Sequence, residues 1–186
     1  MRKLLLIAVW FVAACRDDAV PPPPVSMTET AVGFYCQMEL EEHPGPKAQV
    51  HLKDVSAPLF FAQVRDALAY QRMPEQSHEI AATYVSDMDR APSWADPGED
   101  NWIAAKDAYY VVGSDRAGGM GAAETVPFAS PDGARDFANA HGGQVMRMTD
   151  IPDDALLAPA DTGPATGDAD DDYAERLRAL MQKDAP

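Results

Sequence analysis

One order of predicted elements occurs twice along this chain, and that repetition limits the folds it can adopt. Each copy consists of two strands, a helix and a further strand, recognised from the spacing of apolar residues. Because each helix covers one face of its sheet, two copies predict an α+β protein of two related small units packed together. The first copy has strands at residues 49–52, 58–61 and 80–85 and a helix at 62–72; the second has strands at 109–113, 124–128 and 144–148 and a helix at 131–141.

The second helix has the clearest boundaries. Ser130 is a typical N-cap residue, Pro131 suits the first helical position, and Gly142 follows the last turn. The two copies then define the domain organisation. We expect a first α+β unit at residues 31–88, a linker rich in Trp, Asp and Pro at 89–106, and a second α+β unit at 107–157.

Residues 1–14 have the features of a signal peptide and not of a folded unit. A basic start is followed by an apolar stretch at 4–12, which is too short to cross about 30 Å of hydrocarbon. Small residues precede Cys15, as in the bacterial lipobox, so we expect cleavage after residue 14 and a lipid on Cys15. The alternative is an ordinary secretory signal in which Cys15 is incidental.

Two further segments flank the predicted units. Residues 15–30 are rich in proline, which favours extended polyproline II, so we expect a lipidated tether that holds the domain away from the membrane. Residues 158–186 form an acidic tail, expected to be disordered up to residue 172 because it has no apolar period. A short helix is possible at 172–183, where apolar residues recur at helical spacing.

The composition is acidic but otherwise that of a globular protein. The 15 Lys and Arg residues face 30 Asp and Glu residues, for a net charge of −15. Such a surface repels phosphate, which argues against nucleic acid and anionic lipid headgroups as partners. Hydrophobic residues make up 46% of the chain, enough for a core, so a wholly disordered chain is excluded.

Cys36, Met38 and Met120 are the candidate metal ligands. If a lipid occupies Cys15, Cys36 has no disulfide partner in the chain, which is unusual for an exported protein. In an extended segment Cys36 and Met38 would point to the same side. Met120 lies among glycines that leave it uncovered, and a pseudo-twofold arrangement of the units could bring it to Cys36. Thiolate and thioether donors together favour Cu(I).

Other interpretations of these residues stay open. Methionine at a strand edge is more often a core residue than a ligand, and we expect this for Met146 and Met148. His51 could add an imidazole, although a hydrogen-bonded structural histidine is the commoner case.

The sequence contains no recognisable catalytic motif. GxSxG, HExxH, CxxC and a glycine-rich phosphate loop after a strand are all absent. A Cys36 nucleophile with a distant histidine base is the remaining enzymatic alternative, and nothing marks which histidine would serve. We therefore expect no enzymatic activity.

Several motifs occur together between the N-terminus and residue 157. They are the lipobox with Cys15, Tyr35-Cys36-Gln37-Met38, the run at 42–49, Arg72-Met73-Pro74-Glu75-Gln76, Pro92-Ser93-Trp94, Trp102-Ile103-Ala104-Ala105 and Gly118-Gly119-Met120-Gly121. With this combination the chain resembles the NosL family, the copper-binding accessory lipoproteins of nitrous oxide reductase. The resemblance implies two related α+β units and copper ligation by Cys36, Met38 and Met120.

The resemblance also implies a function. It implies a Cu(I) chaperone of denitrifying bacteria, lipid-anchored and facing the periplasm. Its partners would be a membrane ABC-type complex with a periplasmic subunit that accepts the copper and, through that complex, nitrous oxide reductase. The acidic surface would suit a basic docking face and make transfer sensitive to salt. The alternative is a non-metal adaptor lipoprotein of an envelope complex, with Cys36 a small buried hydrophobe.

Overall fold

The computed structural model describes residues 20–74 and 78–157. The predicted signal peptide at 1–14, the lipidation site Cys15 and the predicted tail at 158–186 lie outside the described residues. Within these two ranges, no helix has the length and hydropathy needed to span a bilayer.

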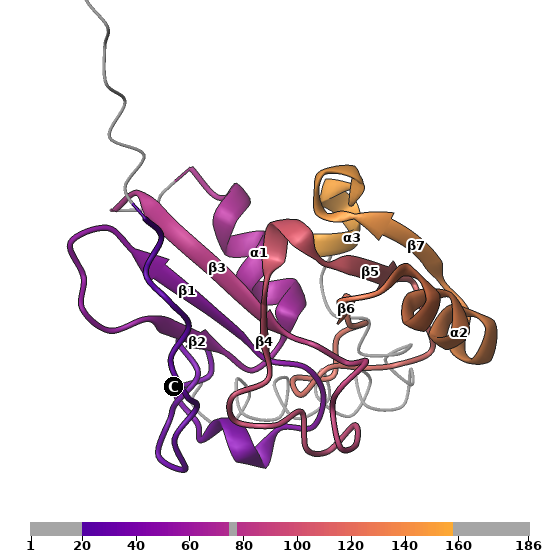
Figure 1. Ribbon diagram of the computed structural model, residues 1–186, viewed down its shortest axis with the longest axis horizontal. Helices are drawn as coiled ribbons and strands as arrows, with labels where there is room; N and C mark the ends of the chain where they lie inside the picture. The colour runs from indigo at the N-terminus through magenta and orange to yellow at the C-terminus, as the bar shows by residue number, and fades with distance from the viewer. Residues whose placement is uncertain (1–19, 75–77, 158–186) are drawn as a thin grey trace, which may run out of the picture.

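The first unit is an antiparallel sheet with strand order β2-β1-β3-β4 and a helix against it (Figure 1). Val50 in the centre of β1 lies opposite Leu59 on one side and Thr83 on the other, which defines the register. The predicted strands and helix of this unit are all present, with shifts of one or two residues at their ends. The bounds are β1 Ala48–Leu52, β2 Leu59–Phe61, α1 Val64–Arg72, β3 Ile80–Ser86 and β4 Trp102–Ala104.

Strand β4 was not predicted, because it lies within the segment interpreted as a linker. It pairs with β3, where Ile103 lies opposite Val85. With only three residues, β4 is too short for an alternating pattern to be recognised, and the surrounding Trp, Asp and Pro residues indicate loops. Residues 89–106 therefore contribute a strand to the first sheet in addition to joining the units.

The second unit repeats the topology of the first. Its sheet has the order β6-β5-β7, so in both units the first strand lies between the second and the third. This arrangement confirms the α+β class and the two related strand-strand-helix-strand units. Ser130 caps α2 by accepting a hydrogen bond from Gly133 N at 3.0 Å, as predicted. The bounds are β5 Tyr109–Val112, β6 Val126–Phe128, α2 Pro131–His141 and β7 Gln144–Arg147.

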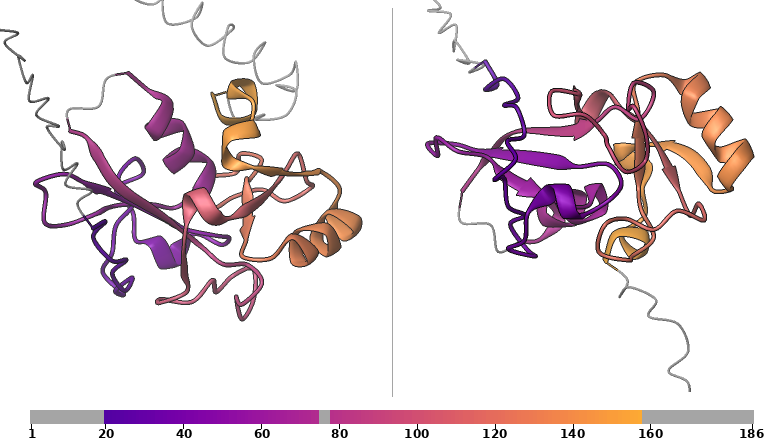
Figure 2. Two further views of the ribbon diagram at one scale, coloured as in Figure 1. Left: turned by 45° about the horizontal axis from the view of Figure 1, so that its top comes forward. Right: turned by 90° about the horizontal axis from the view of Figure 1, so that it is seen from below.

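Short helices complete the described chain. The 3-10 helices are η1 (Leu40–Glu42), η2 (Ala105–Asp107) and η3 (Met148–Asp150), and a last α-helix, α3, covers Asp153–Leu157. Figure 2 shows the two units side by side, with α2 at the end of the second unit remote from the first.

Strand β1 is buried on both faces. Ala48, Val50 and Leu52 enter the core beneath α1. On the opposite face, the Gln49 side-chain amide donates to Val25 O and accepts from Val25 N, both at 2.9 Å. Residues 20–27 thus lie along the first sheet, which differs from the free spacer that proline content predicts. The reason is that the Gln49 amide satisfies the backbone groups of an extended segment as a neighbouring strand would.

The second sheet also packs on both faces. Tyr110 and Met146 belong to a core shared with the first unit, whereas Val111 and Val145 pack beneath α2. This alternation is what a strand of period two produces when both faces are covered. Met148, like Met146, is partly buried and packs against this shared core, which agrees with the prediction that both methionines serve packing.

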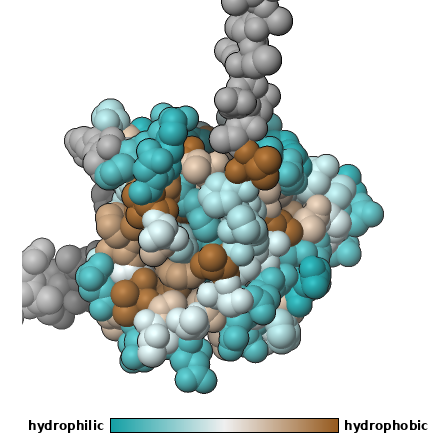
Figure 3. Space-filling model, turned by 60° about the vertical axis from the view of Figure 1, so that its left-hand side comes forward, coloured by the Kyte–Doolittle hydropathy of each residue, from teal (hydrophilic) through white to brown (hydrophobic). Residues whose placement is uncertain are grey.

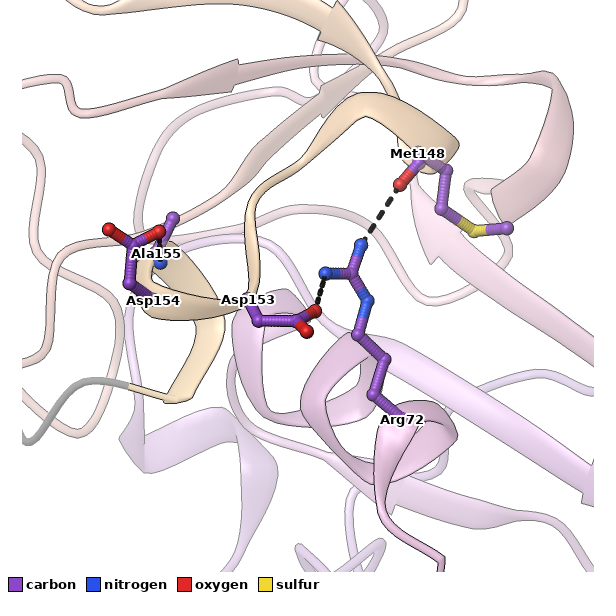
Figure 4. Close-up of polar contacts among 5 residues, drawn as sticks. All are labelled: Arg72, Met148, Asp153, Asp154 and Ala155. Atoms are coloured by element: carbon purple, nitrogen blue, oxygen red, sulfur yellow. Dashed lines mark hydrogen bonds and ion pairs between the residues drawn. The ribbon is translucent and has the colours of Figure 1, made fainter.

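Polar contacts join η3 and α3 to the first unit (Figure 4). Arg72 at the end of α1 forms an ion pair with Asp153 of α3, and its Nη2 donates to Met148 O at 3.2 Å. On the face drawn in Figure 3, hydrophobic residues form separate patches among hydrophilic ones.

Candidate metal centre

Cys36 lies in a tight loop at residues 33–38. Gly33 N donates to Met38 O and Gln37 N donates to Gly33 O, both at 2.9 Å. Gln37 adopts a left-handed conformation with φ of 56°. The expectation of an extended segment was therefore wrong here, because the chain reverses direction and alternate residues no longer share one side.

The Cys36 side chain is partly buried against the first unit. It packs beside Leu40 and Ala62, and its Sγ lies 3.9 Å from Met38 O. A Cβ at Gly33 would come within 2.5 Å of this sulfur, so glycine at position 33 makes room for the thiol. Cys36 is a free cysteine in the described part of the chain. The thiol is therefore free to bind a metal ion from its solvent-exposed side.

Met120 is presented by a second loop, residues 117–123, between β5 and β6. The loop closes through Gly118 N, which donates to Ala122 O at 2.8 Å, and through an isolated bridge between Ala117 and Ala123. The Met120 side chain is 44% exposed. Methionine is apolar, so an exposed side chain indicates a role other than core packing.

Two side chains of the first unit hold this second loop. Met120 N donates to Gln63 Oε1 at 3.1 Å, and His43 Nδ1 lies 3.0 Å from Gly119 O. His43 is buried, and its Nε2 has no hydrogen-bond partner among the described residues. These contacts place Met120 by fixing its backbone and leave its thioether uncommitted.

A buried carboxyl group lies beneath the same loop. Glu124 Oε1 accepts hydrogen bonds from Arg65 N at 3.0 Å and Thr125 N at 2.8 Å. Burial raises the pKa of Glu124 to about 8, against the opposing effect of those bonds. A Cβ at Gly118 would lie 2.4 Å from Glu124 Oε2, so glycine is required where the loop crosses this carboxyl.

Cys36 and Met120 line one pocket of about 360 Å³. The structure thus brings together the thiol of the first unit and a thioether of the second, as the repeat suggested. Met38 is not among the lining residues, and its side chain is 45% exposed. The remaining lining residues are Tyr35, Phe61, Ala62, Gln63, Arg65, Asp66, Ala69, Met73, Ala122, Leu156 and Leu157.

Met73 is a pocket residue that the sequence analysis did not single out as a ligand. It directly follows α1, and its Sδ lies 3.9 Å from the hydroxyl of Tyr35. The sequence does contain a signal for this residue. Met73 lies after a predicted helix and before Pro74, so it is outside the apolar face of the helix and is not needed for the core. Only the tertiary structure shows that this helix end reaches the same pocket.

The histidines do not line this pocket. His51 is buried, its Nε2 lies 2.8 Å from Gln49 Oε1, and burial lowers its pKa. Its role in the first sheet is therefore structural, as the commoner interpretation predicts. No cluster of three or more His, Cys, Asp or Glu side chains suited to a metal ion occurs within residues 20–74 and 78–157.

Acidic side chains adjoin the loop that carries Cys36. Glu39, Glu41 and Glu42 follow it in sequence and are exposed, and Asp66 lies in the pocket wall. The one buried lysine nearby, Lys47, donates to the carbonyls of His43 and Gly45 at 2.6 Å, and burial lowers its pKa to about 8. The exposed charge next to the pocket is thus negative, which attracts cations and basic protein surfaces.

Two related α+β units with thiol and thioether groups around one open pocket define a class of small proteins that offer soft donors to a metal ion. Comparison with known proteins narrows that class. The model of the NosL family matches residues 24–156, and the chain belongs to the NosL family.

Named relatives are similar over most of their length. A copper-binding lipoprotein NosL of Achromobacter cycloclastes is 52% identical over 95% of this chain and 93% of its own. A second copper-binding lipoprotein NosL, from Stutzerimonas stutzeri, is 36% identical over 74% of this chain and 70% of its own. The crystal structure of the copper chaperone NosL from Shewanella denitrificans matches with a TM-score of 0.65 and 32% identity, over 70% of this chain and 97% of that one.

Proposed function

We propose that this protein binds Cu(I) as cargo through Cys36 and Met120, with Met38 as a further ligand from the Cys36 loop. The observation that carries the proposal is the convergence of a thiol and a thioether from two different units on one pocket. Softness of the donors favours Cu(I) over zinc, magnesium or calcium. Met38 lies two residues from Cys36 on the same loop, and its side chain is exposed, so its thioether is open to a metal ion beside Cys36.

The geometry suits a carrier better than a permanent metal site. A carrier must bind tightly enough to suppress free copper and yet let an acceptor's sulfur displace its ligands one at a time. Met38 and Met120 are each nearly half exposed, so an incoming ligand has access to the metal from solvent. A site of one thiolate and a few thioethers meets both requirements.

The resemblance to the family suggests a recipient. We propose delivery to the periplasmic subunit of a membrane ABC-type complex and, through it, to the copper centres of nitrous oxide reductase. Relatives are named copper-binding lipoproteins, which supports a lipid anchor at Cys15 and a position on the periplasmic side of the envelope. Relatives named for copper binding also support a role without catalysis.

An anaerobic Cu(I) titration of the mature chain against a competing chelator tests copper binding. Cys36→Ala should abolish tight binding, because Cys36 is the only free thiol among the described residues and its thiolate is lost. Met120→Leu and Met38→Leu keep the side-chain volume. Each should raise the Kd for Cu(I) at least about tenfold, because even the loss of a residue that only supports a metal ligand lowers the affinity by that factor.

The matched control is Met148→Leu, which changes a methionine of the shared core outside the pocket. Its Kd for Cu(I) should equal that of the unaltered protein. If Cys36→Ala binds Cu(I) with unchanged affinity, the proposed site is wrong. Absence of any copper binding would instead favour the non-metal adaptor function.

A further inference from the structure

We propose that Met73 supplies an additional thioether ligand to Cu(I) in this pocket and that the hydroxyl of Tyr35 holds it in position before copper arrives. The proposal rests on the copper-binding function proposed above. It assigns a role to a methionine on a third segment, the end of α1, in addition to the Cys36 loop and the Met120 loop.

The placement of Met73 is determined by α1. The buried face of this helix, with Val64, Ala67 and Leu68, packs into the main core, so the position of its last turn is fixed. Met73 caps that turn with its N–H directed to Tyr70 O at 3.3 Å, and its own backbone is extended. The chain therefore turns away from the helix axis at Met73 and carries the side chain to the pocket wall.

The Met73 side chain is not used for core packing. It is 39% exposed, although burial of apolar surface is favourable. It shares the pocket wall with Cys36 and Met120, whereas Met38 does not. An exposed thioether beside a thiol and a second thioether extends the set of soft donors that selects Cu(I).

Tyr35 joins Met73 to the Cys36 loop. Its hydroxyl lies 3.9 Å from Met73 Sδ, a separation compatible with a weak O–H···S hydrogen bond. The Tyr35 ring packs edge-on against Phe61, with centroids 5.3 Å apart and planes at 86°. This contact restrains the ring, so the Tyr35 hydroxyl holds the Met73 sulfur close to the Cys36 loop.

A thioether sulfur has two lone pairs, so the Met73 sulfur can accept the Tyr35 proton with one and donate to a metal ion with the other. Binding of Cu(I) by Met73 forms a metal–sulfur bond with no change of oxidation state and no proton released. Where the hydrogen bond is given up, the Tyr35 hydroxyl turns to water, to which it is open because the residue is 47% exposed. Tyr35 is thus a positioning residue and Met73 a ligand.

The test follows methionine methyl groups by NMR in the full-length mature protein, labelled with ¹³C at the methionine methyl. Cu(I) is added without oxygen, and signals are assigned with Met73→Leu, Met120→Leu, Met38→Leu and the control Met148→Leu. We expect the Met73 and Met120 methyl signals to shift together and saturate at one equivalent of Cu(I), while the Met148 signal stays in place.

Affinity measurements complete the test. Met73→Leu should raise the Kd for Cu(I) at least about tenfold, and Tyr35→Phe, which keeps the ring, should raise it by a smaller but measurable factor and shift the Met73 methyl signal before copper is added. Thermal unfolding should be unchanged in both variants, which separates ligation from a packing defect.

The outcomes separate the two proposals. An unmoved Met73 methyl signal beside a shifted Met120 signal, with unchanged affinity in Met73→Leu, overturns the role of Met73 and leaves the copper site intact. Failure of the unaltered protein to bind Cu(I), with every methyl signal unmoved, overturns both.

Discussion

At the scale of single residues, Glu124 is the most consequential buried group. It is 1% exposed, burial raises its pKa to about 8, and it therefore carries a proton at neutral pH. Lys47 and Asp66 act on it in opposite directions, the lysine lowering and the aspartate raising its pKa. Glu124 Oε2 has no hydrogen-bond partner among the described residues. The neutral carboxyl is therefore favoured, because burial of an ionised carboxylate without a partner costs much more free energy than burial of the neutral form.

This burial predicts how stability varies with pH. Between the ordinary Glu value of 4.5 and about 8, the folded protein retains a proton at Glu124 that the unfolded chain releases. The free energy of unfolding should therefore fall as pH rises through this window, by at most about 1.4 kcal/mol per pH unit from this group. Urea unfolding at several pH values should show a smaller decline in Glu124→Gln.

The control for this prediction is Glu79→Gln, which alters an exposed carboxylate paired with Lys53. It should leave the pH dependence unchanged. Lys47 contributes the opposite slope above about pH 8, because its lowered pKa lets the folded protein release a proton that the unfolded chain keeps. An unaltered slope in Glu124→Gln would show that this carboxyl is ionised in the folded state.

At the scale of elements, the loop at 117–123 decides where Met120 lies. The sequence predicted an uncovered methionine among glycines, but not which glycine matters. Gly119 packs on His43, where a Cβ would come within 2.4 Å of His43 Cβ and 3.2 Å of its Cα. The glycine is needed because the first unit's backbone lies against the loop, a contact that local sequence does not reveal.

Gly119→Ala should therefore displace the loop and move Met120 from the pocket. We expect the Kd for Cu(I) to rise at least about tenfold, comparable to the loss of a supporting contact around a metal. Chelator competition measures the affinity. Ser130→Ala is the control, because removal of the α2 cap costs about 1 kcal/mol of stability without touching either loop. Equal copper affinity in both variants would contradict the loop's role.

At the scale of the whole molecule, the charge distribution would govern the encounter with the proposed acceptor. The net charge is −15, and exposed glutamates lie directly after the Cys36 loop. The opposite end of the molecule carries α2, with exposed Asp136. Steering of a basic acceptor toward the pocket thus depends on where the negative charge lies as well as on its total.

Transfer of Cu(I) to the proposed periplasmic acceptor subunit should slow as ionic strength rises, because salt screens exposed charges beyond about 10 Å at 0.1 M. Glu41→Lys should slow transfer at low salt and weaken its salt dependence. Asp136→Lys changes the net charge equally but at the remote end, and should have a smaller effect. Stopped-flow transfer rates measure both. Rates that do not respond to salt would exclude electrostatic steering.

The sequence by itself determined the α+β class, the two repeated units and the ends of α2, and it singled out Cys36 and Met120, which line one pocket. These follow from local patterns, namely apolar spacing, capping residues and the types of side chain. Strand β4 and the docking of residues 20–27 escaped prediction, because three residues have no period and a proline-rich segment gives no sign of a binding surface.

Only the tertiary structure decided which sulfur groups share the pocket. The backbone at Gln37 is left-handed and Met38 is not among the residues that line the pocket, whereas the packing of α1 brings Met73 to it. Both outcomes depend on contacts between residues far apart in the chain, which spacing along the sequence does not encode. The sequence motifs identify Cys36 and Met120 as candidates, and the packing of the two units places both side chains in one pocket.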